Sequence, residues 1–141
     1  MGSRSTKAGS SHLGQLGKVS LALRVWSRFL LVRLMLPREA LPAFVERLGQ
    51  PSRRSRRRLS HALLSRAVHR SLRVGDRRPT CLVASLVLFR LLREQGDPAE
   101  VVIGLPALAT NKDAHAWVEL EGVDVGPPPG RGRHEPMARF G

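Results

Sequence analysis

The strongest nucleophile in this sequence is its single cysteine, Cys81. Cys81 follows Thr80, a common helix N-cap, and opens a long apolar run that Gly96 can end, so we expect a helix over residues 81–95. The unpaired N–H groups and the positive end of such a helix favour the thiolate, which is the nucleophilic form of cysteine. A lone cysteine among leucines is also commonly a small buried hydrophobic residue. Position on the helix alone therefore leaves both interpretations open.

A histidine downstream could supply the base that a cysteine nucleophile needs. Residues 114–120, AHAWVEL, alternate apolar and polar side chains, which predicts a strand with His115, Trp117 and Glu119 on one face. A strand histidine by itself is usually a surface or core residue. A cysteine at a helix start followed by a histidine on a later strand, however, is typical of a Cys-His-acid catalytic site.

Two aspartates, Asp124 and Asp113, are candidates for the acid that would orient this histidine. A two-residue turn at positions 121–122 places Asp124 opposite Glu119, two side-chain steps along the strand from His115. Asp124 could orient the imidazole only if the hairpin is shifted or bulged. Asp113, on the other side of the histidine, is the second choice. We favour Asp124.

These residues require a helix and an antiparallel sheet to bring them together, and the chain predicts an α+β fold. A length of 141 residues predicts one domain. The Gly/Ser-rich composition of the first residues predicts a disordered lead-in. We divide the chain into a lead-in at 1–18, a basic helical region at 19–79 and a catalytic core at 80–141. We expect strands at 101–103, 114–120 and 123–125, and a mostly irregular Pro/Gly-rich tail from residue 126.

The first predicted helix, over residues 19–36, is apolar enough to need a membrane test. Arg24, Arg28 and Arg33 lie within it, and each opposes membrane insertion, so we do not expect a transmembrane segment. An apolar stripe at three- and four-residue steps is formed by Leu23, Trp26, Leu30 and Leu34. This stripe predicts a helix packed against the rest of the domain. The alternative is a basic amphipathic surface helix for a membrane or a partner protein.

The net charge is +13, and the positive excess lies mainly before residue 80, where Arg53–Arg58 form a basic cluster. Such a charge makes a nucleic-acid-binding protein one hypothesis. No recognisable nucleic-acid motif supports it, and the absence of tyrosine disfavours base stacking. A docking surface for an acidic peptide or partner is the interpretation we prefer. One cysteine excludes an internal disulfide, and His61 and His69 have no carboxylate cluster beside them, so no metal or cofactor is expected.

Residues 81–126 resemble the transglutaminase-like cysteine peptidases of lasso-peptide biosynthesis. The matching motifs are Cys81–Leu82, Gly96–Ala99, Ile103–Gly104, Ala114–Glu119 and Gly122. The resemblance implies a transglutaminase-like, papain-like core in which Cys81 attacks a peptide carbonyl and His115 activates it. One departure stands out: Pro127 occupies the position where family members usually carry an acidic residue.

The same resemblance implies a function in the cytoplasm. The enzyme would remove the leader from a ribosomally made precursor peptide, so that an asparagine-synthetase-like cyclase can close the macrolactam ring on the freed amine. A separate leader-recognition protein would assist it and could dock on residues 1–80. Because of Pro127, the alternative is a catalytically weak or inactive transglutaminase-like binding subunit.

Overall fold

The computed structural model describes residues 14–51, 58–74, 76, 78–106, 114–129 and 134–141. Predictions that concern the lead-in before residue 14, Arg53–Arg57 and Asp113 lie outside these residues. The fold is α+β, as predicted, with helices followed by an antiparallel sheet. The helices are α1 Gln15–Met35, a short 3-10 turn η1 Leu36–Arg38, α2 Leu41–Leu48, α3 His61–Ser71 and α4 Cys81–Glu94. The strands are β1 Ala99–Pro106, β2 His115–Leu120, β3 Val123–Gly126 and β4 His134–Phe140.

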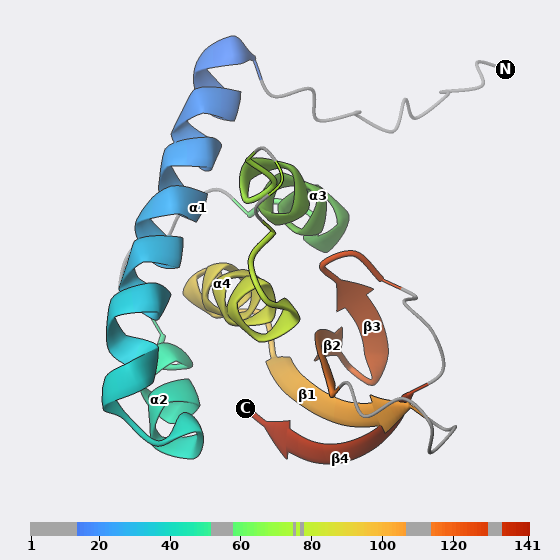
Figure 1. Ribbon diagram of the computed structural model, residues 1–141. Coiled ribbons are helices and arrows are strands. Elements are labelled where there is room, and N and C mark those ends of the chain that lie inside the picture. Colours follow the sequence, from blue (N-terminus) through green and yellow to red (C-terminus); the bar gives the residue numbers. More distant parts are fainter. Residues whose placement is uncertain (1–13, 52–57, 75, 77, 107–113, 130–133) are drawn as a thin grey trace, which may run out of the picture.

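Helix α4 lies at the centre of the molecule, between α1 and the sheet (Figure 1). Ten of its fourteen residues are buried, which fits an apolar run with little polar interruption. Helix α3 packs beside it and also contacts α1 and β3. Val25 of α1, Leu64 of α3 and Val118 of β2 belong to one hydrophobic core with α4. The helical region and the strand region therefore fold around the same centre.

The four strands lie in the order β3-β2-β1-β4, and all neighbours are antiparallel. The predicted hairpin is confirmed, since Glu119 pairs with Asp124 across a two-residue turn. Both turn residues, Glu121 and Gly122, have positive φ, as tight hairpins of this kind require. A bulge interrupts the pairing between Val118 and Glu119.

The prediction of an irregular tail is wrong for residues 134–140, which form β4 and pair with β1. Most side chains of β4 are exposed, so the strand has no apolar alternation that a sequence pattern could detect. Its Pro136 is compatible with an edge strand, where one side of the backbone needs no partner. Strand β1 also runs further than expected, to Pro106.

The prediction that the apolar stripe of the first helix packs against the rest of the domain is wrong. Leu23, Trp26, Leu30 and Leu34 are between 36% and 65% exposed. Helix α1 instead buries Leu21, Val25 and Val32. It begins at Gln15, so the last residues of the expected lead-in belong to it. No helix in the described part of the chain is long and apolar enough to cross a membrane.

A buried carboxylate explains which side of α1 faces inward. Glu94 of α4 is nearly inaccessible, with 4% of its side chain exposed. Arg28 of α1 donates from Nε to Glu94 Oε1 at 2.5 Å, Arg90 does so at 3.0 Å, and Arg24 Nη2 lies 3.6 Å from Oε2. Removing a carboxylate from water without cations nearby is costly. Arg24 and Arg28 must therefore face α4, and the leucine stripe is turned toward solvent.

Candidate active site

Cys81 is the first residue of α4, as the sequence predicted. The Thr80 side chain caps the helix by accepting a hydrogen bond from the Val83 N–H at 3.4 Å. The first bond of the helical series runs from the Ala84 N–H to the Thr80 carbonyl. The N–H groups of Cys81 and Leu82 therefore lie outside the helix's own hydrogen bonds. They are donors available to an oxygen atom that carries negative charge beside the thiol.

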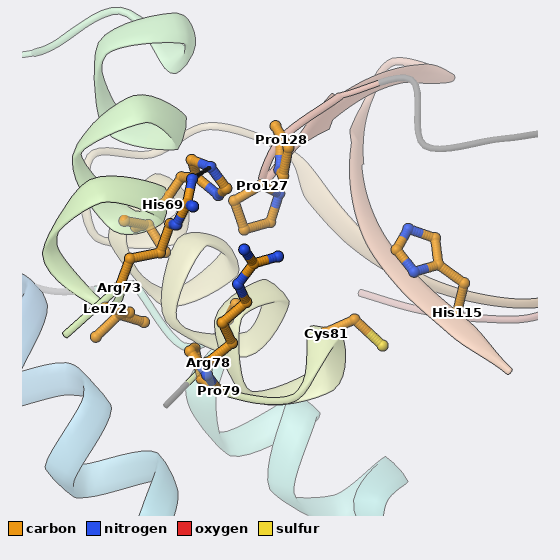
Figure 2. A pocket seen from close by; sticks show the side chains of 11 residues that line it. His69, Leu72, Arg73, Arg78, Pro79, Cys81, His115, Pro127 and Pro128 are labelled. Carbon is orange, nitrogen blue, oxygen red and sulfur yellow. Dashed lines mark hydrogen bonds between the residues drawn. The ribbon is translucent and has the colours of Figure 1, made fainter. Parts of the chain in front are cut away.

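Two contacts of α4 dock its first turns on the backbone that flanks His115. The Cys81 thiol lies 3.9 Å from the Ala114 carbonyl oxygen. One turn later, the Ser85 hydroxyl donates to the Ala116 carbonyl at 3.0 Å, and Ser85 is fully buried. Figure 2 shows the thiol and the imidazole on these two neighbouring elements. The structure thus brings Cys81 and His115 to one site, although they are 34 positions apart in the chain.

Ser85 is a residue that the sequence analysis missed. Its signal was present, because it is the one hydroxyl within the apolar run of α4 and lies four residues after Cys81. A polar side chain on a buried helix face requires a partner. Here the partner is the strand that carries the histidine.

The His115 ring belongs to a cluster of three rings on the strands. It stacks on Trp117 with centroids 5.9 Å apart and an interplanar angle of 20°, and it lies 4.8 Å from the His134 ring. Trp117 is buried because the glycine at position 104 leaves room for its ring. A Cβ at Gly104 would lie 2.7 Å from the Trp117 ring and 2.6 Å from the Glu135 carbonyl oxygen.

His134 escaped the sequence analysis because its strand was expected to be irregular. His134 lies on β4, and β4 and β2 pair with opposite edges of β1. This arrangement places the His134 ring beside the ring of His115.

The opposite end of the ring cluster is fixed by charge. The Trp117 indole N–H donates to Glu119 Oε1 at 2.9 Å, and Arg139 donates to the other oxygen at 2.5 Å. Hydrogen bonding and attraction to this carboxylate raise the pKa of Arg139 above its usual value. Glu119 thus holds the indole in place, and the indole supports the imidazole that stacks on it.

The predicted orienting acid lies further along the hairpin. Asp124 pairs with Glu119, and the four residue steps from His115 to Glu119 correspond to about 13 Å along the strand. Asp124 Oδ1 accepts a hydrogen bond from the Gly126 N–H at 2.8 Å. A role of Asp124 toward the imidazole stays a prediction, and Asp113 lies outside the described residues. The prolines that follow Gly126 form part of the wall of the site itself.

A small pocket of about 90 Å³ opens in front of the thiol. Cys81 is partly accessible from it. The pocket is lined by Val68, His69, Leu72, Arg73, Arg78, Pro79, Cys81, Ala84, His115, Pro127 and Pro128. Helix α3, the segment before α4, strand β2 and the prolines after β3 therefore all contribute to it (Figure 2).

A sequence profile of the transglutaminase-like superfamily matches residues 19–139. The chain belongs to the transglutaminase-like superfamily. The match includes α1 and β4 as well as the segment from Cys81 to β3, so the helices before the cysteine are part of the transglutaminase-like domain. No curated protein and no solved structure matches this chain.

Proposed function

We propose that this transglutaminase-like protein is a cysteine peptidase in which Cys81 is the nucleophile and His115 the general base and acid. The observation that carries the proposal is the docking of the start of α4 against the two carbonyls that flank His115, through Cys81 and Ser85. This docking sets a thiol at a helix N-terminus and an imidazole on the wall of one pocket. Superfamily membership supports the same pairing.

The chemistry of such a site is acyl transfer. The Cys81 thiolate attacks the scissile carbonyl carbon, and the carbonyl oxygen takes up the negative charge. The N–H groups of Cys81 and Leu82 donate to that oxygen. His115 then gives its proton to the leaving amine as the C–N bond breaks. Water, deprotonated by the same imidazole, hydrolyses the thioester and restores the thiol.

The substrate that we propose is the precursor of a lasso peptide. The motifs Cys81–Leu82 and Ala114–Glu119 support this finer assignment. The peptidase would remove the leader before a cyclase joins the freed amine to a side-chain carboxylate. A separate leader-recognition protein would present the precursor.

The test is cleavage of a short precursor peptide encoded beside this chain's gene, in the presence of its leader-recognition protein, followed by mass spectrometry. Wild-type protein should release the leader, whereas Cys81→Ala and His115→Ala should lose at least 100-fold in rate, as expected for nucleophile and base. Circular dichroism of each variant checks that the fold is retained. Cleavage that continues unchanged in Cys81→Ala would overturn the proposal.

A second candidate function, a transglutaminase-like binding subunit without catalysis, is favoured by Pro127 at the position where an acid is expected. The two candidates differ in the reactivity of the thiol. A catalytic pair predicts rapid alkylation of Cys81 at neutral pH that slows on acidification and in His115→Ala. Alkylation no faster than that of a small free thiol, together with no precursor cleavage, would decide for the binding subunit.

A further inference from the structure

Two arginine side chains lie on the side of the pocket opposite His115 (Figure 2). Arg73 follows the end of α3, and Arg78 lies three residues before Cys81. Both line the pocket, and Figure 2 shows the Arg78 side chain reaching across it toward Pro127. Arg73 Nη1 lies 3.3 Å from His69 Nε2, a ring that lines the same pocket. The two guanidinium groups therefore lie on one side of the nucleophile.

The described lining of this pocket carries no negative charge, since none of these residues is acidic. Asp76, which lies between the two arginines in the sequence, is exposed and is not among the lining residues. Within the described part of the chain, Arg73 and Arg78 form no ion pair, in contrast to Arg28 and Arg139, which are held by the carboxylates of their neighbours. The start of α4 adds the positive end of a helix to the same space. Three sources of positive potential thus converge on a small, partly enclosed volume.

We propose that this pocket is an anion subsite that takes the carboxylate of an aspartate or glutamate side chain adjoining the scissile bond of the substrate peptide. Arginine presents a planar fork of N–H donors that fits a carboxylate with two parallel hydrogen bonds. The volume of about 90 Å³ suits a carboxylate and a few waters. Pro127 and Pro128 line the same pocket and offer apolar contact to the stem of such a side chain. The identity of the ligand as substrate rests on the proposed peptidase function, whereas the affinity for anions does not.

The single cysteine makes the local potential measurable without any substrate. Iodoacetate and iodoacetamide alkylate the same sulfur, but the first is an anion and the second is neutral. The ratio of their rate constants cancels the fraction of thiolate and reports the field at Cys81. Relative to the ratio for a small free thiol, we expect an increase of about 5- to 10-fold at low ionic strength, which falls as salt is added.

The double variant Arg73→Gln/Arg78→Gln should bring this ratio back toward that of the free thiol. The matched control is Arg70→Gln, because Arg70 is exposed on the same helix, α3, and does not line the pocket. The control should retain the wild-type ratio. A ratio unchanged in the double variant, or lowered as much in the control, would overturn the anion subsite.

The substrate assignment has its own readout. A precursor with glutamate beside the cleaved bond should show a KM at least 10-fold below that of its glutamine counterpart, and the double variant should erase this difference. If the alkylation ratio responds but cleavage does not distinguish glutamate from glutamine, the pocket binds anions and the assignment to the substrate is overturned. Failure of the peptidase function would be recognised separately. A thiol without a catalytic base reacts slowly with both reagents, but the ratio of the two rate constants can still be measured.

Discussion

The hydrogen bond from Ser85 to Ala116 can be removed with one small substitution, Ser85→Ala. Ser85 is fully buried, and its hydroxyl donates to the carbonyl of the residue after His115 at 3.0 Å. Alanine leaves that buried carbonyl without this donor, which costs about 1–3 kcal/mol. Alanine is also the better helix former, which returns a few tenths of a kcal/mol. We therefore expect the free energy of unfolding to fall by about 1–2.5 kcal/mol.

The chain offers a matched control in α1. The Ser27 hydroxyl also donates to a backbone carbonyl, that of Arg24, at 2.8 Å, but this bond is exposed to water. Ser27→Ala removes the same kind of bond from the same kind of element, so the gain in helix propensity is shared. Because water replaces the lost donor, the expected change is within about 0.5 kcal/mol. The difference between the two variants isolates the cost of burial at the α4–β2 contact.

Guanidinium unfolding, followed by tryptophan fluorescence, measures both variants on the same scale. The alkylation rate of Cys81 supplies a second readout, because a loosened contact between α4 and β2 separates the thiol from the imidazole. We expect this rate to fall in Ser85→Ala and to be unchanged in Ser27→Ala. Equal stability losses in the two variants, or an unaltered alkylation rate in Ser85→Ala, would refute the docking role assigned to Ser85.

Two further predictions concern close packing and buried charge. Gly104→Ala should lower the free energy of unfolding by about 1–3 kcal/mol, because the new methyl group meets the Trp117 ring at 2.7 Å and the neighbouring strand's backbone; an unchanged unfolding midpoint would contradict this account. Glu94→Gln should cost about 3 kcal/mol, since it removes the buried charge that partly buried arginines pair with. The control Glu39→Gln removes a partly exposed ion pair with Arg47 and should lower the free energy of unfolding by less than about 1 kcal/mol. Equal effects of the two substitutions in thermal unfolding would argue against a buried network.

The main parts of the candidate site could be predicted from the sequence because their signals are local. A threonine before an apolar run sets a helix start, which places Cys81. Strict alternation with a glycine-containing turn sets a hairpin and its register, which places His115. What the sequence could not provide was the set of neighbours from other elements. The rings beside His115 come partly from β4, whose position depends on pairing with β1.

The same distinction applies to the helices. The existence of α1 follows from its periodic apolar residues, but its orientation does not. Hydrophobic periodicity favours the stripe through Leu23 and Leu30 as the buried side. The orientation of α1 depends instead on Glu94, a buried residue of α4 that lies 66 positions after Arg28. No pattern within α1 carries that information.

The inverted orientation of α1 changes which of its positions can vary. In an ordinary amphipathic helix the leucines are constrained and the charged residues are free to change. Here an arginine at position 30 would extend into water, whereas a leucine at position 28 would remove a cation from a carboxylate that water cannot reach. A substitution scan of this helix should therefore be tolerant at its exposed leucines and intolerant at Arg24 and Arg28. Hydrophobicity alone would predict the opposite result, with the leucines constrained and the arginines free to vary.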